Sequence, residues 1–368
     1  MSIIKNTSLM HEVIDKMEYM VRVMDAEHKV IYMNQKMLHE FGNTKGQICY
    51  ELLCRTEKCE HCVTSGSKET GQPDTKNVAI GDKYYNVMSS PVSTDDGQSY
   101  SIELLQDITE QKKIEDELIR HYEKLKADIE FAKHIQNRAL PVDGEHWGII
   151  HTSSAYLPSE DLGGDLFDII KIEEDKTLLY IADISGHGVR SSLITIFLRQ
   201  LIRGRTYEAQ VDLHELLDIL VKSYNELGIE EEQYLSVLFC IYDRKKGELT
   251  ILNAGHNCLP IIIKKSGKIE EILVRGMPVC SLIKKSNHEQ VRIRVQRGDR
   301  IILYTDGITE TYSKKSQKPF GSEGIIRILK ENPQLKGHEL TDMIIKEVKS
   351  FTGMEPIDDM AILVAELL

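Results

Sequence analysis

The fold is constrained most by a series of short apolar runs that fills the chain from about residue 141 onward. Several neighbouring runs are separated by turn sequences of only a few residues, such as "DRKKGE" and "KKSGK". Turns this short join antiparallel strands, whereas parallel strands need a long crossover connection. Residues 141–368 are therefore expected to form a sheet-rich α+β domain, with helices at "GVRSSLITIFLRQLIRG" and "LHELLDILVKSYNEL". The expected strands are "DLFDIIKI", "TLLYIADI", "YLSVLFCIYD", "ELTILNAG", "LPIIIKK", "VRIRVQ", "RIILYTD" and "MAILVAEL".

One long helix is expected before this domain. Between residues 108 and 140 the sequence contains neither glycine nor proline, and Pro141 ends the pattern. We expect residues 111–140 to form a coiled-coil linker that makes the protein a homodimer, although His121 and Asp128 interrupt the apolar heptad positions. The alternative is a helix packed on its own domains. The apolar positions at four-three spacing are Ile114, Leu118, Leu125, Ala132, Ile135 and Ala139.

Residues 1–110 form a segment of their own, with strand-like runs around turn sequences. The stretch "VMDAEHKVIYMNQKMLHEFG" resembles the opening of a PAS sensor domain, including the position of Asn34. The exit "LLQDITEQKK", from Asp107 to Glu110, is similar to the junction of that family with a signalling helix. The resemblance implies a PAS fold that senses a small ligand, a metal or a redox state.

A cluster of cysteines lies within this segment, at Cys49, Cys54, Cys59 and Cys62. The spacing Cys-x4-Cys-x4-Cys-x2-Cys suits a zinc site, an iron–sulfur cluster or a dithiol switch, and is similar to cysteine-bearing PAS domains of anaerobic bacteria. The alternative is that Cys49 and Cys54 are core residues. With seven cysteines in a reducing compartment, a disulfide framework is not expected.

Charge, apolar run length and the absence of one motif argue against several classes of function. The formal net charge is -12, which argues against a nucleic-acid partner. No apolar run approaches the roughly 20 residues that span a bilayer, so we expect a cytoplasmic protein without a membrane partner. No "GxxxxGK[ST]" sequence is present, which argues against a kinase or ATPase.

Aspartates recur where the apolar runs begin or end. Asp183 and Asp306 end two of the runs, Asp358 and Asp359 precede another, and Asp165 follows a glycine pair. Carboxylates brought together in this way repel one another unless divalent ions such as Mg²⁺ or Mn²⁺ neutralise them. Two such ions activate a water and stabilise charge on a phosphoryl group, which predicts hydrolysis of a phosphoester. Aspartate before glycine is also ordinary turn chemistry, and this is the alternative.

Five motifs in order strengthen the metal interpretation: "DLGGDLFD", "IADISGHGVRSSL", "LNAGHN", "LYTDGITE" and "DDMAILV". They resemble the SpoIIE/RsbU-type branch of the PPM family of metal-dependent protein phosphatases, and "AKHIQNRALP" is similar to the segment that precedes its catalytic domain. The resemblance implies that residues 141–368 form an α/β sandwich of two antiparallel sheets flanked by helices. It also implies attack by an activated water on phosphoserine or phosphothreonine, without a phosphoenzyme.

The resemblance carries over to individual residues. It implies Asp165, Asp183 and Asp306 as catalytic residues and two bound Mn²⁺ or Mg²⁺ ions. Of the aspartate pair, Asp358 is favoured as the direct ligand and Asp359 as a supporting residue. The implied metal-binding residues are Asp165, Asp183, Ile184 through its carbonyl, Asp306, Asp358 and Asp359. The implied loop residues near the site are Gly164, Gly186, His187 and Gly307.

One departure concerns the general acid. Ser185 stands where eukaryotic-type members carry a histidine, and His187 follows two residues later. We expect His187 to shape the loop rather than to donate a proton, and we expect His256 to be structural. A serine nucleophile is disfavoured, because no third residue can be assigned to orient Ser185.

The resemblance also implies a partner, namely a small phosphorylated anti-sigma-factor antagonist of the STAS fold. A rival function is a catalytically weak binding protein that keeps the fold and sequesters a partner. The presence of the metal aspartates favours the enzyme. The continuous helix suggests that the state of the sensor changes helix packing and thereby moves the element that carries Asp165.

Overall fold

The computed structural model describes residues 7–368 except 52–56, 58, 96, 187, 207–210, 229–232, 282–287, 314–317 and 354–356. The chain divides into two compact units, Met1–Lys124 and Leu125–Leu368. The boundary falls inside one continuous helix, α4 (Thr109–Ala139). Each unit has its own hydrophobic core.

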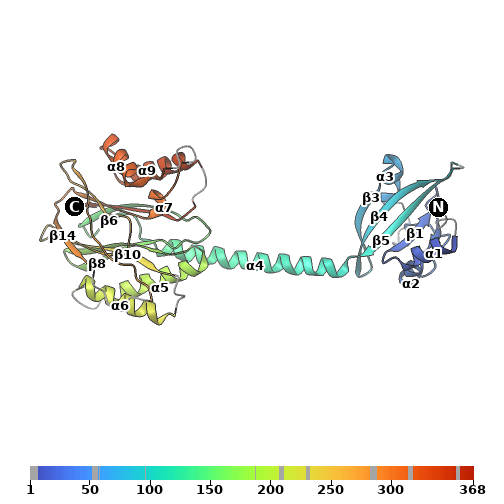
Figure 1. Cartoon of the computed structure of the whole chain (residues 1–368), viewed down its shortest axis with the longest axis horizontal. Helices are drawn as coiled ribbons and strands as arrows, with labels where there is room; N and C mark the ends of the chain where they lie inside the picture. The colour runs from blue at the N-terminus through green and yellow to red at the C-terminus, as the bar shows by residue number, and fades with distance from the viewer. Residues whose placement is uncertain are drawn as a thin grey trace. The chain divides into compact units, whose positions relative to one another are not determined.

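The N-terminal unit is built on one antiparallel sheet with the order β2-β1-β5-β4-β3 (Figure 1). The helices α2 (Gln35–Phe41) and α3 (Val63–Thr70) lie between the second and third strands in sequence. Asn34 caps α2 and is fully buried. Its side-chain oxygen also accepts a hydrogen bond from the backbone N–H of Val21. The other elements are α1 (Thr7–Lys16), β1 (Met20–Met24), β2 (Val30–Met33), β3 (Asp74–Ile80), β4 (Lys83–Ser93) and β5 (Ser99–Asp107).

The helix α4 confirms the prediction of one long helix before Pro141. Within the described chain its apolar side chains remain exposed, with Leu118 at 68% and Tyr122 at 66% of full exposure. Such a stripe leaves a helix face that the rest of the described chain does not cover. No helix in the part of the chain described here combines the length and apolar character that a bilayer span needs.

The C-terminal unit is a sandwich of two antiparallel sheets between two pairs of helices (Figure 1). One core lies between the sheets and includes Phe167, Leu238 and Leu363. A second core packs α5 (Val189–Thr206) and α6 (Leu213–Glu226) on one sheet, and a third packs α8 (Gly321–Glu331) and α9 (Gly337–Thr352) on the other. This architecture confirms the expected α/β sandwich.

The two sheets have the orders β14-β11-β10-β9-β8 and β13-β12-β15-β16-β7-β6. Every strand run expected from the sequence is present. The first sheet contains β8 (Leu166–Glu173), β9 (Lys176–Ile184), β10 (Leu235–Asp243), β11 (Glu248–Ala254) and β14 (Gln290–Arg294). The second contains β6 (Gly144–His146), β7 (Ile150–Leu157), β12 (Ile261–Ile263), β13 (Ile269–Glu271), β15 (Arg300–Tyr304) and β16 (Met360–Leu367).

Candidate metal centre

The aspartates singled out in the sequence lie at strand ends from both sheets. Asp165 directly precedes β8 and Asp183 is the penultimate residue of the neighbouring β9. From the second sheet, Asp306 begins the short helix α7 (Asp306–Thr309) after β15, and the pair Asp358 and Asp359 precedes β16. Contacts between β9 and β15 and between β8 and β16 bring these ends together.

Asp165 is a buried carboxylate, at 3% exposure. The hydroxyl of Thr305 donates to its Oδ2 over 2.6 Å, although the two residues are 140 positions apart. Burial raises the pKa of Asp165 well above its usual range, and the nearby charge of Asp183 raises it further. The fold therefore holds this carboxylate where a negative charge is costly without a cation.

Asp183 shows the same effect. Burial, together with the neighbouring carboxylates of Asp306, Asp358, Asp359 and Glu310, raises its pKa to about 7. Like charges so close to one another are stable at neutral pH when protons or divalent cations compensate them. The electrostatics therefore match a site for a hard cation.

The two adjacent aspartates Asp358 and Asp359 have different surroundings. Asp359 is buried, and its Oδ1 accepts hydrogen bonds from the backbone N–H and the hydroxyl of Ser159, at 2.7 and 2.9 Å. Its Oδ2 accepts the backbone N–H of Gly164 over 2.5 Å. Asp358 is exposed, and its Oδ1 caps the N–H of Asp359 over 2.8 Å. Asp359 thus braces the backbone that leads into Asp165.

Two glycines allow the backbone segments of the site to approach each other. A Cβ on Gly164 would lie 2.8 Å from the carbonyl oxygen of Ile184, and a Cβ on Gly307 would lie 2.1 Å from that of Asp359. Both positions consequently exclude any larger residue. The carbonyl of Ile184 is therefore held beside the segment that carries Asp165.

The loop after Ile184 is only partly described. Gly186 has a backbone φ of 93°, which favours glycine. Ser185 pairs with Tyr234, since its hydroxyl accepts the Tyr234 N–H over 2.8 Å. His187 lies outside the described residues.

His256 has the contacts of a structural residue. It is 2% exposed, and its Nε2 donates to the backbone carbonyl of Tyr304 over 2.9 Å. Its Nδ1 then accepts from the hydroxyl of Ser236 over 3.1 Å, which requires the neutral ring. Burial lowers the pKa of His256 and keeps it in that form.

Several residues at the site had no role assigned from the sequence. Asn257 donates to Asp306 Oδ2 over 3.1 Å and to Glu310 over 3.4 Å. Burial raises the pKa of Glu310, as does the charge of Asp306. Thr305 and Glu310 both lie inside the motif "LYTDGITE". Their closeness to Asp306 in the sequence is the feature that could have placed them at the site.

Gln136, near the end of α4, is also at the site. Its side chain is 5% exposed and forms two hydrogen bonds with the backbone of Gly163. Nε2 donates to the Gly163 carbonyl over 2.7 Å, and Oε1 accepts the Gly163 N–H over 3.3 Å. The last turn of α4 is thereby bonded directly to the glycine pair before Asp165.

The donor set fits Mg²⁺ or Mn²⁺. Carboxylates and a backbone carbonyl are the oxygen ligands that these ions prefer. Among the described residues no group of three or more acidic, thiol or imidazole side chains is close enough to hold an ion without further ligands. Mg²⁺ keeps several waters in its coordination shell and is usually bound through one or two carboxylates of a protein.

The two packed antiparallel sheets, their flanking helices and the aspartates at one end define the fold of the PPM phosphatases. A sequence model of the family described as Stage II sporulation protein E (SpoIIE) matches residues 173–368. The chain belongs to the SpoIIE family.

Individual relatives agree with this assignment. Phosphoserine phosphatase RsbP of Bacillus subtilis is 24% identical over 231 residues, which cover 61% of this chain and 53% of RsbP. Phosphoserine phosphatase RsbU of the same organism is 19% identical over 244 residues, covering 66% of this chain and 70% of RsbU. The chain thus spans about half the length of RsbP and somewhat more of RsbU.

Solved structures show the same fold. The SiaA-PP2C domain of Pseudomonas aeruginosa superposes with a TM-score of 0.57 at 18% identity, covering 67% of this chain and 98% of that domain. A structure of the PP2C phosphatase domain and a fragment of the regulatory domain of SpoIIE from Bacillus subtilis gives a TM-score of 0.51 at 16% identity. It covers 80% of this chain and 82% of that one.

Proposed function

We propose that this protein is a metal-dependent serine/threonine protein phosphatase. The observation that carries the proposal is the position of Asp165, Asp183, Asp306 and Asp358 at adjoining strand ends of two sheets, with the pKa of Asp165 and of Asp183 raised by burial and by neighbouring carboxylates. A binding protein that only sequesters a partner has no need for such a costly arrangement of charge.

We assign a set of oxygen ligands to two Mn²⁺ or Mg²⁺ ions, namely the carboxylates of Asp165, Asp183, Asp306 and Asp358 and the carbonyl of Ile184. When bound, the ions supply an activated water and neutralise charge on the phosphoryl group. Thr305 fixes Oδ2 of Asp165, and Asn257 fixes Oδ2 of Asp306.

Asp359 has a supporting role in this proposal. Its two oxygens already accept three hydrogen bonds from Ser159 and Gly164, and they hold the Asp165 segment in place. Asp358 is exposed beside it, which supports Asp358 as the direct ligand of the pair.

The names of RsbP and RsbU as phosphoserine phosphatases support a phosphoserine or phosphothreonine substrate. We propose a small phosphorylated STAS-fold antagonist of an anti-sigma factor as that substrate, in the cytoplasm. The decisive assay is Mn²⁺-dependent release of phosphate from such a protein and from a simple aryl phosphate.

The assay compares the wild type with Asp183→Asn. Asp161→Asn is the matched control, because Asp161 is exposed, lies in the same aspartate-rich segment, and forms a long, exposed ion pair with Lys133 at 3.5 Å. We expect activity in the wild type and in the control, and its loss in Asp183→Asn. Equal activity in all three proteins would remove the two-metal assignment, while tight binding of the phosphoprotein without turnover would favour the sequestering alternative.

We further propose that the N-terminal unit is a PAS sensor and that α4 carries its signal. The single antiparallel sheet with helices inserted between its second and third strands supports the PAS assignment. The exposed apolar face of α4 supports a coiled-coil homodimer through the linker. The contact of Gln136 with Gly163 supplies the physical link between the helix and the Asp165 segment.

Rigid coupling through the helix can be tested by inserting four residues near Leu125. The insertion shifts the helical phase by about 40° while preserving helical propensity. We expect phosphatase activity to lose its dependence on the signal. Normal signal-dependent activity in this variant would exclude rigid helical coupling.

A further inference from the structure

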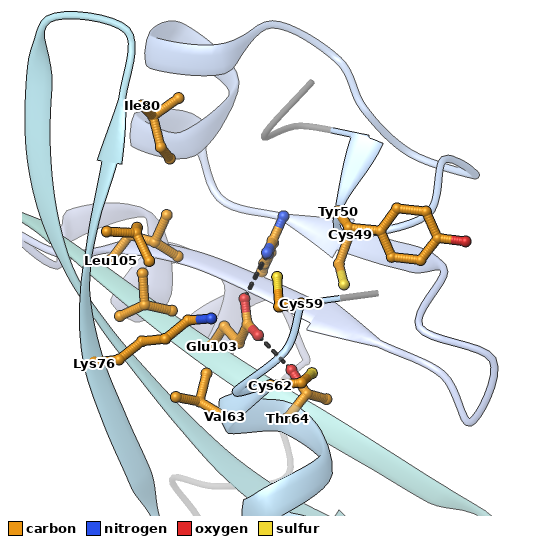
Figure 2. A pocket seen from close by; sticks show the side chains of 13 residues that line it. Cys49, Tyr50, Cys59, Cys62, Val63, Thr64, Lys76, Ile80, Glu103 and Leu105 are labelled. Carbon is orange, nitrogen blue, oxygen red and sulfur yellow. Dashed lines mark hydrogen bonds and ion pairs between the residues drawn. The ribbon is translucent and has the colours of Figure 1, made fainter. Parts of the chain in front are cut away.

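The N-terminal unit contains a small cavity around which three of the clustered cysteines lie (Figure 2). Its volume is about 30 Å³, and the polar residues that line it include Arg22, Cys59, Cys62, Thr64, Lys76 and Glu103. A single water needs at least about 10–15 Å³ by this measure, so the cavity has room for a molecule of about two heavy atoms. As the described residues enclose it, this space is too small for an organic cofactor.

Arg22 gives the cavity a hydrogen-bond donor. It forms a buried ion pair with Glu103, through Nε at 2.8 Å and Nη2 at 2.7 Å. The hydroxyl of Thr64 donates to the other oxygen of Glu103 over 2.5 Å (Figure 2). Arg22 is 5% exposed, and its Nη1 is buried without a partner among the described residues. A buried donor without a partner points to a ligand that accepts a hydrogen bond.

The three described cysteines differ in chemistry. Cys49 is buried, and burial raises its pKa to about 12, so it remains an unreactive thiol. Cys62 is half-buried and occupies the N-cap of α3. Burial opposes ionisation there, but hydrogen bonds from Ser65 and Thr64 outweigh it and lower the pKa of Cys62. The positive end of a helix acts in the same direction.

Cys59 is the available partner for Cys62. It lies three residues earlier, is also half-buried, and lines the same cavity. A Cys-x-x-Cys pair that ends at a helix N-terminus is the arrangement in which thiolates are reactive. A metal site is the alternative, and Cys54, the remaining cysteine of the cluster, lies outside the described residues.

We propose that this cavity is a peroxide-reactive dithiol site, in which Cys62 is the attacking thiolate, Cys59 the resolving thiol, and Arg22 the group that orients the peroxide. The Cys62 thiolate attacks one oxygen of hydrogen peroxide, the O–O bond breaks, and the second oxygen leaves as hydroxide, which solvent protonates. Nη1 of Arg22 donates to that departing oxygen. Cys59 then attacks the sulfenic sulfur, the S–O bond breaks, and a second water leaves as the disulfide forms.

The test uses the full chain, reduced, freed of metal and treated with one equivalent of hydrogen peroxide. We expect the intact mass to fall by about 2 Da and peptide mapping to find a Cys59–Cys62 disulfide. Cys62→Ser should abolish the product, and Cys59→Ser should leave a sulfenic acid that dimedone captures. Arg22→Lys should slow the reaction about tenfold, with melting curves to verify folding.

Matched controls separate this site from general thiol oxidation. Cys49→Ser removes the inert thiol of the cavity, and Cys280→Ser removes a half-buried thiol of the other unit. Both should react at the wild-type rate. A disulfide to Cys54, an unchanged rate in Cys62→Ser, or purified protein that holds stoichiometric zinc or acid-labile sulfide on unreactive thiols would each overturn the proposal. The readout needs no phosphatase activity, so it is independent of the proposed function.

Discussion

Asp165 and Asp168 lie at the same end of β8, both buried, and the fold treats their charges in opposite ways. Asp168 is 0% exposed and is neutralised by the protein itself, since Arg203 binds it through two nitrogens at 2.6 and 2.7 Å and Arg199 approaches to 3.1 Å. Asp165 instead faces other carboxylates and the hydroxyl of Thr305.

The groups that surround a buried carboxylate distinguish a structural residue from a candidate metal ligand in this fold. A buried charge whose partner is an arginine is compensated within the chain, and removing one partner leaves the other buried and unpaired. A buried charge surrounded by like charges requires a proton or a cation to compensate it, and this is why we propose Asp165 as a cation ligand.

The largest effect is expected on catalysis. Asp165→Asn should lower phosphatase activity about a thousandfold, because metal ions contribute several kcal/mol to transition-state stabilisation. Its unfolding free energy without metal should not fall, since the substitution removes a repelling charge. Steady-state kinetics and urea unfolding measure the two quantities. A variant that kept its activity would place Asp165 with the structural carboxylates.

The second prediction is the converse. Asp168→Asn should lower the unfolding free energy by about 3 kcal/mol, because two arginines lose their buried counter-charge. Urea unfolding of the metal-free protein measures it, with Asp161→Asn expected within about 0.5 kcal/mol of the wild type. Equal stability of the two variants would mean that the arginine cluster does not matter to the fold.

The third prediction concerns pH. The folded-state pKa of Asp183, about 7, and that of Asp165 lie above the unfolded-state value near 3.9. The folded state therefore holds more protons between these values, and the metal-free protein should lose stability as pH rises from about 4 to 7. Melting temperature against pH in EDTA measures this.

Adding Mn²⁺ at pH 7 should restore the stability that the metal-free protein loses, because the ion binds the folded state. Asp183→Asn should flatten the pH profile, whereas Asp161→Asn should not. A profile in EDTA that rises steadily with pH would contradict the raised pKa values.

The smallest effect is expected at the junction with α4. Gln136→Ala leaves the Gly163 peptide groups without their buried partners, which should cost about 1–3 kcal/mol of unfolding free energy and reduce Mn²⁺ affinity. Asn137→Ala, one residue further and exposed, is the matched control. Unfolding and calorimetric Mn²⁺ titration measure both. Identical metal affinity in the two variants would remove Gln136 as the link between helix and site.

The strand-rich sandwich was predictable because its central strands are long apolar runs. The strand β7 (Ile150–Leu157) was missed, since "IHTSSAYL" is rich in small polar residues, yet it pairs with β16 on one side and β6 on the other. The helices α8 and α9 were missed as well, although they cover the outer face of that sheet. Burial by neighbouring elements, which the local sequence does not contain, decides these cases.

At the site, the aspartates could be found from their recurrence at strand ends. Their supporting contacts could not, because they join distant positions. The hydroxyl of Thr305 reaches Asp165, and the oxygens of Asp359 reach Ser159 and Gly164 across about 200 positions. Gln136 was visible only as part of a motif, and its contact with Gly163 depends on how the helix meets the sheet.

His256 joins the two layers of the sandwich near the aspartates. One edge of its ring bonds to Ser236 in β10 and the other to Tyr304 in β15, so a single uncharged side chain crosses from sheet to sheet. A lysine at this position could only donate hydrogen bonds, and an ionised glutamate could only accept them. An uncharged side chain thus links the two sheets at the end of the sandwich where the carboxylates repel one another.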